Sequence, residues 1–412
     1  MKLTTLTSHA VLPVADPVEI AALVTLGSSG VARSTPVDLR FVLDRSGSMN
    51  EPSGVGSQSK LGALRASVAD SLDLLDVGED QVSCVAFADA MTRVLDTQVL
   101  PSDVERSRMK AAVRKLRSAG STALADSLDH AIGVASQKPG AARRAVVFTD
   151  GHVNAGTDQK TRCLALADGA AEHGVPLAVF AVGVDYDEAF LRDLATRAGL
   201  GSYYAHLASV QDLSRALGDE IAQLRSAAES DVTVTFTPAA GVTLLEVTRF
   251  VPQQLEVVGV TRGGATDRLA ALDARGQRYL LRLRLAGGRA AVHSLFVTEV
   301  RCRHGGRDLT ARDEAFVELC DDARSAASPD ATVLATVVNA AGVRAATQGN
   351  LPLAKTLFTH SGNAAMVHQL TVLGSAASAN TAGQAGRTLR TIVASQAHLP
   401  TLGSTPPAGR TP

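Results

Sequence analysis

The chain has 412 residues, 45% of them hydrophobic and 20% charged, which is enough for two or three domains with buried cores. Its formal net charge of -1 gives no reason to expect a nucleic acid or an anionic membrane as the main partner. No apolar run approaches the ~18 residues of a membrane-spanning helix, and Asp16 and Glu19 interrupt any signal-peptide core. We therefore expect a globular, cytoplasmic protein whose four cysteines are thiols.

Two extended segments open the chain, over 8–14 and 18–26, with Asp16 and Pro17 predicted as the turn between them. They are not followed by a helix, so they do not form a βα unit with the next strand. We expect residues 1–37 to join a β-sandwich built mainly from residues after position 230.

Residues 38–229 alternate between strand and helix patterns, which predicts an α/β fold with a Rossmann-like, doubly wound parallel sheet. The segment over 92–100 is expected to be antiparallel at the edge of this sheet. Strands are predicted over 38–43, 81–87, 144–149, 176–184 and 202–206, and helices over 60–75, 104–116, 122–136, 159–173, 187–197 and 210–224.

A carboxylate and two hydroxyls follow the first buried strand on alternate residues: Asp44, Ser46 and Ser48. If the backbone leaves the sheet still extended, these three side chains project to one side. Oxygen ligands of this kind suit a hard divalent cation such as Mg²⁺. Serine and aspartate also serve as turn residues and helix caps, so this segment alone leaves that alternative open.

Two further segments carry oxygen ligands at the expected edge of the same sheet. Thr122 precedes a helical pattern, and Asp150 ends a buried strand. The carboxyl ends of parallel strands meet at one edge, which brings such residues together. Asp44, Ser46, Ser48, Thr122 and Asp150 resemble, position for position, the metal-ion-dependent adhesion site of von Willebrand factor A domains.

This resemblance covers roughly residues 38–229, and the flanking segments look like those of multi-domain bacterial members of the family. It implies that the five residues hold Mg²⁺, with Mn²⁺ and Ca²⁺ as alternatives, and that the ion accepts an acidic side chain from a partner protein. The implied function is therefore metal-dependent protein binding without catalysis. The sequence names neither the partner nor the oligomeric state.

After the α/β region, the alternation of strand and helix patterns gives way to strand-like segments alone. Strand-like segments over 231–236, 242–247, 254–260 and 279–285 predict a β-sandwich within 231–318. Residues 325–399 are predicted to be helical, with helices over 332–346 and 354–359, and the Pro- and Gly-containing tail 400–412 is predicted to be disordered.

Other functions have weaker support. A strand-end aspartate could serve a metal-dependent phosphatase, but Ser46 and Ser48 stand where that site needs a second acid. A structural or scaffold subunit with contacts through the sandwich or the helical tail remains an alternative. His152 could contact a partner, and Cys302 and Cys320 could lie near each other. Arginines between 278 and 307 could suggest nucleic acid, but the chain has few stacking aromatics.

Overall fold

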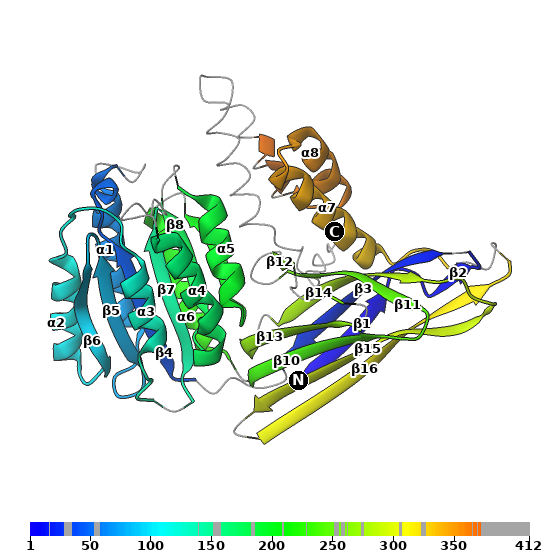
Figure 1. Cartoon of the computed structure of the whole chain (residues 1–412), viewed down its shortest axis with the longest axis horizontal. Helices are drawn as coiled ribbons and strands as arrows, with labels where there is room; N and C mark the ends of the chain where they lie inside the picture. The colour runs from blue at the N-terminus through cyan, green and yellow to red at the C-terminus, as the bar shows by residue number, and fades with distance from the viewer. Residues whose placement is uncertain are drawn as a thin grey trace, which may run out of the picture.

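The computed structural model contains an α/β domain, a two-sheet β-sandwich and a pair of helices (Figure 1). It describes residues 1–371 except 16, 29–34, 53–57, 139, 151–157, 183–185, 208–209, 228, 251–254, 257–259, 262, 273–275, 305–306, 323–326, 365 and 369. The predicted disordered tail lies outside these residues. No helix in the described part of the chain is long and apolar enough to cross a bilayer.

The α/β domain is built on a six-stranded sheet in the order β6-β5-β4-β7-β8-β9. Only β6, at one edge, runs antiparallel to its neighbour, as the sequence predicts. The central strand β4 is buried along its whole length, which explains the apolar run Phe41-Val42-Leu43 before its last residue, Asp44. The strands are β4 (Val37–Asp44), β5 (Gln81–Phe87), β6 (Met91–Val99), β7 (Ala142–Thr149), β8 (Leu177–Val182) and β9 (Tyr203–Leu207).

Helices cover both faces of this sheet, so the predicted doubly wound α/β fold is confirmed. One core gathers residues of α1, α2 and α6, and the other gathers residues of α3, α4 and α5. An apolar stripe of α1 and the turn after it lies in the first core: Leu61, Leu64, Val68, Leu72 and Leu75. The helices are α1 (Lys60–Ser71), α2 (Asp103–Arg114), α3 (Ala125–Gly133), α4 (Gln159–His173), α5 (Glu188–Ala198) and α6 (Val210–Arg225), with short 3₁₀ turns η1 (Gly47–Asn50) and η2 (Leu72–Leu74).

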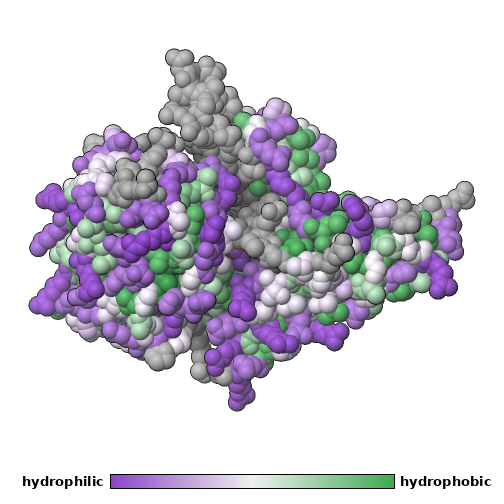
Figure 2. All heavy atoms as spheres, viewed as in Figure 1, coloured by the Kyte–Doolittle hydropathy of each residue, from purple (hydrophilic) through white to green (hydrophobic). Residues whose placement is uncertain are grey.

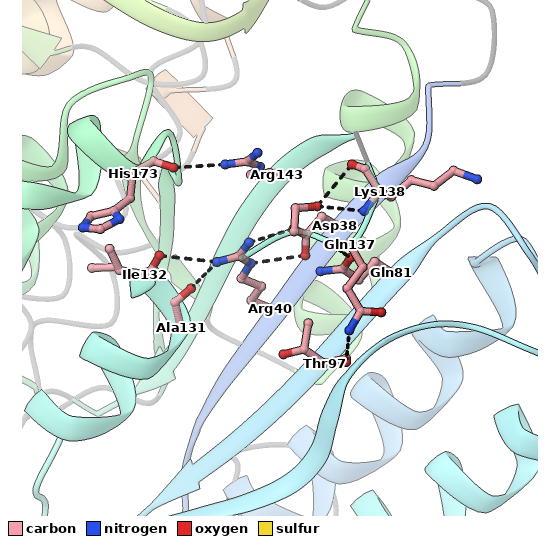
Figure 3. Close-up of polar contacts among 11 residues, drawn as sticks. Asp38, Arg40, Gln81, Thr97, Ala131, Ile132, Gln137, Lys138, Arg143 and His173 are labelled. Carbon is pink, nitrogen blue, oxygen red and sulfur yellow. Dashed lines mark hydrogen bonds and ion pairs between the residues drawn. The ribbon is translucent and has the colours of Figure 1, made fainter. Parts of the chain in front are cut away.

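A buried ion pair fastens α3 to the central strand (Figure 3). Asp38 and Arg40 both lie on β4 without solvent exposure, and Arg40 Nη2 is 2.8 Å from Asp38 Oδ2. Arg40 Nη1 also donates to the carbonyl oxygen of Ala131 at 2.7 Å, near the C-terminal end of α3. A cation at this end of a helix satisfies carbonyl groups that lack helical partners. The central strand therefore fixes the position of α3 along the sheet.

The sandwich consists of two five-stranded sheets, β1-β3-β14-β11-β12 and β13-β10-β15-β16-β2, which share one hydrophobic core. The N-terminal strand β3 pairs with β14 from Val18↔Leu285 to Leu26↔Gln277. The strands are β1 (Lys2–Thr7), β2 (Val11–Pro13), β3 (Val18–Gly27), β10 (Glu229–Pro238), β11 (Val242–Arg249), β12 (Leu255–Glu256), β13 (Ala265–Leu272), β14 (Gln277–Leu285), β15 (Ala291–His304) and β16 (Arg307–Cys320).

The chain enters and leaves the α/β domain at neighbouring points. The amide of Thr35 donates to the carbonyl oxygen of Arg225 at 3.2 Å, and its hydroxyl donates to Ala227 O at 2.7 Å. The two larger units also touch directly, because the amide of Ala270 in β13 donates to Leu200 O at 3.1 Å. Leu200 adopts a positive φ of 52° between two glycines, which turns its carbonyl group toward the sandwich.

The helical region packs on the sandwich through α7 (Ala331–Thr347), which pairs with α8 (Leu351–His360). Ala340 of α7 shares a small core with Phe250 and Leu280. Arg344 Nη1 donates to Glu246 Oε1 of β11 at 2.6 Å. Both apolar and ionic contacts therefore attach this helix to the sheet.

In this part of the chain the sequence leaves four strands unpredicted, and two expectations are wrong. The strand Lys2–Thr7 was not predicted, and neither were β13, β15 and β16. The segments 8–14 and 18–26 are not neighbours in a hairpin, because β2 pairs with β16 in the other sheet. Cys302 and Cys320 are not close, because Cys302 pairs with Leu309 while Cys320 lies eleven positions farther along β16, about 35 Å away.

Candidate metal centre

The predicted site begins where β4 ends, at a carboxylate with no solvent exposure. Oδ1 of Asp44 accepts a hydrogen bond from the amide of Ser46 at 2.8 Å. Oδ2 accepts one from the hydroxyl of Thr149, the last residue of β7, at 2.7 Å. The Asp44 side chain is therefore fixed between its own loop and the neighbouring strand.

Asp150 follows β7 and is also fully buried. Burial, and after it the negative charge of Asp150, raises the pKa of Asp44 to about 6, against the opposing effect of hydrogen bonds from Ser46 and Thr149. The two strands thus bring two buried carboxylates close enough to repel each other. A cation between such groups would offset both the repulsion and the cost of burying the charge.

The hydroxyls of Ser46 and Ser48 face each other, with their Oγ atoms 3.1 Å apart. Ser46 occupies the N-cap position of η1, but its side chain makes no capping hydrogen bond. The expected extended backbone is wrong at Ser48, which lies inside this 3₁₀ turn. The turn nevertheless brings the two hydroxyls together, so the capping alternative for Ser46 loses its main support.

The loop that carries Thr122 is fastened to the first loop by backbone hydrogen bonds. The amide of Gly47 donates to Gly120 O at 3.1 Å, and the amide of Ala119 donates to Arg45 O at 2.8 Å. Thr122 itself is almost fully buried. The N-cap of α3 is Leu124, without a side-chain capping bond, so Thr122 does not serve as the cap.

A third strand-end aspartate, Asp89, was not identified from the sequence. It follows β5 and accepts hydrogen bonds from the amide of Ser121 at 2.8 Å and from its hydroxyl at 2.7 Å. The amide hydrogen bond, followed by the hydroxyl, lowers the pKa of Asp89. Gly120 has a φ of +61°, and a Cβ there would come within 1.9 Å of Asp89 Oδ2. Polar residues just after the strands of a parallel sheet meet at one edge of the sheet, and the position of Asp89 shortly after β5 is the sequence signal that points to it. Its role in the structure is to position the Thr122 loop.

The structure therefore gathers the predicted residues from three loops at the carboxyl edge of the sheet. Asp44 and Asp150 interact electrostatically, Ser46 and Ser48 touch, and the Thr122 loop lies against the loop of Ser46. Gly151 and His152 lie outside the described residues, so the prediction for His152 stays a prediction.

The donor set fits a small, hard cation. It offers carboxylate and hydroxyl oxygens, which suit Mg²⁺. No cluster of three or more His, Cys, Asp or Glu side chains placed to hold a metal occurs among the described residues. The described cysteines are all free, and Cys84 and Cys163 are buried in the α/β domain. Soft-metal ligation therefore has no support in this part of the chain.

Several basic side chains that could suggest an anion or nucleic-acid site form ion pairs with neighbouring carboxylates. Nζ of Lys60, the first residue of α1, lies 2.7 Å from Glu51 Oε2. Arg284 lies 2.8 Å from Glu19, and Arg282 lies 3.3 Å from Glu246. These basic groups are partly neutralised within the fold.

Comparison with known proteins shows what the α/β domain and the whole fold are similar to. Residues 38–222 match the family profile described as von Willebrand factor type A domain. A solved structure described as von Willebrand factor type A from Catenulispora acidiphila is similar over 97% of both chains, with 17% identity and a TM-score of 0.75. The ArnB paralog VWA2 from Sulfolobus acidocaldarius matches over 95% of this chain and 97% of its own, with 13% identity and a TM-score of 0.58. No curated protein matches. Both structural likenesses extend beyond the α/β domain into the sandwich and the helices, and they concern the fold.

Proposed function

We propose that this von Willebrand factor type A domain binds a partner protein through Mg²⁺ held by Asp44, Ser46, Ser48, Thr122 and Asp150. One observation carries the proposal: two hydroxyls 3.1 Å apart lie in a loop that begins at Asp44, whose pKa is raised by burial and by Asp150. Hydroxyls and carboxylates in this arrangement are ligands for a hard cation, and because Mg²⁺ takes about six oxygen ligands, the five residues leave a coordination position for a carboxylate oxygen of a partner.

The five proposed ligands contribute in two ways. Ser46, Ser48 and Thr122 provide neutral oxygens, while Asp44 and Asp150 provide the negative charge, directly or through water. Thr149, Gly47 and Gly120 hold the loops in register through the bonds described above. A bound Mg²⁺ would supply an electrophilic position for the carboxylate of a partner's Asp or Glu. We also propose a cytoplasmic location and membership of the multi-domain bacterial type.

The first test compares Mg²⁺ binding by the full chain and by the Asp44→Ala, Asp150→Ala double variant in isothermal titration. We expect the double variant to lose binding, while Ser67→Ala keeps it, because the Ser67 hydroxyl pairs with that of Ser214 between α1 and α6 and is not one of the proposed ligands. An unchanged Mg²⁺ affinity in the double variant would remove the proposal.

A second test uses stability. At a concentration of 100 times Kd, Mg²⁺ should stabilise the wild-type protein by about 2.7 kcal/mol. Asp150→Asn should raise the stability of the metal-free protein, because it removes the repulsion from Asp44, and should abolish the gain from Mg²⁺. A metal-free Asp150→Asn protein that is less stable than wild type would contradict this account of the site.

A scaffold function is the second candidate. Among the residues that the structure describes, seven of the ten large exposed hydrophobic side chains lie outside the α/β domain: Leu6, Val14, Val292, Leu309, Phe316, Leu334 and Leu353. In Figure 2 the visible face of the α/β domain is mostly hydrophilic. Pull-downs with Mg²⁺ and with a chelator separate the two candidates, because contacts through the sandwich or helices would survive chelation. A panel of phosphate esters with Mg²⁺ tests the phosphatase alternative.

A further inference from the structure

A large cleft lies between the α/β domain and the sandwich, with a volume of about 1080 Å³. Its walls include Pro36, Ala142 and Pro176, next to the N-terminal ends of β4, β7 and β8, and residues of β10 and β13. Asp44 and Asp150 lie at the opposite ends of their strands. The cleft is therefore separate from the candidate metal centre.

Most charged groups in the cleft already face an opposite charge. Arg303 Nη1 is 3.9 Å from Asp231, and Arg144 Nε is 2.5 Å from the buried Glu220 in α6. The fully buried Glu229 lies 3.7 Å from both His304 Nδ1 and the amino group of Met1. These pairs account for both carboxylates that line the cleft.

Two arginines remain without a counter-charge, one from each domain. Arg143 lies on β7 and donates only to the carbonyl oxygen of His173, at 3.1 Å (Figure 3). Arg268 lies on β13, a strand in contact with β7. Within the described part of the chain, neither guanidinium takes part in an ion pair. The Nη1 atom of the buried Arg144 also has no hydrogen-bond partner in this wall. The cleft thus carries an excess of positive charge where the two domains meet.

We infer that this cleft binds a small organic anion with at least two negative charges, whose phosphate or carboxylate oxygens bridge Arg143 and Arg268. The planar guanidinium group matches both kinds of oxygen pair, and arginine is the residue that most often recognises them. The volume suits a metabolite-sized ligand, and the buried amide of Gln277 adds a polar group to the wall. Because one arginine comes from each domain, the bound anion fixes the angle between the domains. This inference does not depend on the proposed metal site.

The experiment titrates the full chain with pyrophosphate and, separately, with citrate by calorimetry. The buffer is depleted of metals, because both probes chelate Mg²⁺, and the ionic strength is held constant. The test variant is Arg143→Gln, Arg268→Gln. The matched control is Arg289→Gln, Arg312→Gln, which removes the same charge from exposed positions that do not line the cleft.

We expect saturable binding of at least one probe by the wild type and the control, and an affinity at least about tenfold lower in the test variant. Binding of pyrophosphate alone identifies a phosphate-bearing ligand, and binding of citrate alone identifies a polycarboxylate. Circular dichroism must show that the test variant melts within a few degrees of wild type. If it does not, the single variant Arg268→Gln, at an exposed position, is used in its place. Absence of saturable binding, or equal affinity in the test variant and the control, overturns the inference.

Discussion

Replacing Arg40 by methionine tests the role of the buried ion pair in the α/β domain. The substitution removes the hydrogen bonds from Arg40 to Asp38 and to Ala131, while methionine fills much of the same space. It leaves the carboxylate of Asp38 buried without its cation. The C-terminal end of α3 also loses its donor.

The expected cost is large because both partners are fully buried. Removing one member of a buried ion pair typically costs about 3–5 kcal/mol, since the remaining charge is uncompensated. Asp38→Leu combined with Arg40→Met removes both charges, and such replacements are often close to neutral. We therefore expect the double variant to be more stable than Arg40→Met alone. The control Arg215→Met breaks an exposed pair with Asp212 and should cost less than about 1 kcal/mol.

Urea unfolding followed by tyrosine fluorescence is a suitable assay. The chain has no tryptophan and four tyrosines, and three of them, Tyr186, Tyr203 and Tyr204, lie in the α/β domain. The signal therefore reports mainly on the domain that contains Arg40. If Arg40→Met cost no more than Arg215→Met, or if the double variant were the less stable of the two, the argument from burial would be wrong.

Three further predictions concern other parts of the chain. Gly120→Ala should lower the free energy of unfolding by about 1–2 kcal/mol or more, because Gly120 has a positive φ and the new Cβ would collide with Asp89. It should also weaken Mg²⁺ binding in calorimetry. Gly133→Ala is the control, because a Cβ there meets nothing within 4 Å. Asp187→Ala should lower the free energy of unfolding, measured in urea, by about 1 kcal/mol, because Asp187 caps α5 by accepting a hydrogen bond from the amide of Phe190. An unchanged urea midpoint of unfolding would contradict this prediction. Although burial raises the pKa of Glu246, hydrogen bonds and charges from Thr248, Arg344 and Arg282 lower it overall. The ionised form thus stabilises the fold above the unfolded pKa of about 4.3, and this contribution is lost as the pH falls. The stability difference between wild type and Glu246→Gln should be present at pH 7, shrink below about pH 4.3 and be lost once the pH lies below the lowered pKa of Glu246. A difference independent of pH would refute this account.

The sequence predicts the α/β domain well because its periodic patterns are strong. The helix expected over 159–173 has those bounds in the structure, and the antiparallel edge strand β6 was also expected. Asp44 and Asp150 are predictable from the sequence because each stands at the end of a buried, largely apolar strand. Asp89 is harder to identify because it lies two residues beyond the end of β5, whereas Asp44 is the last residue of β4 and Asp150 directly follows β7.

The sandwich was harder to predict for a physical reason. β1 alternates only between exposed and half-buried residues, and the first eight residues of β16 are exposed or half-buried, so neither strand shows a clear apolar pattern. In addition, β16 pairs with β2, which lies far away in the sequence, and such pairing depends on tertiary contacts rather than on local preference. The 3₁₀ conformation at Ser48 is likewise set by contacts between loops, which an alternating pattern does not reveal.

The placement of the α/β domain between β3 and β10 has a consequence for biosynthesis. Strand β3 leaves the ribosome early, but its partner β14 follows only after well over half of the chain has been made. The intervening domain can close from its own residues, and the bonds of Thr35 to Arg225 and Ala227 then bring the two halves of the sandwich together, which shortens the loop that remains to be closed. We expect the part synthesised in the middle to fold first and the two ends to assemble around it afterwards.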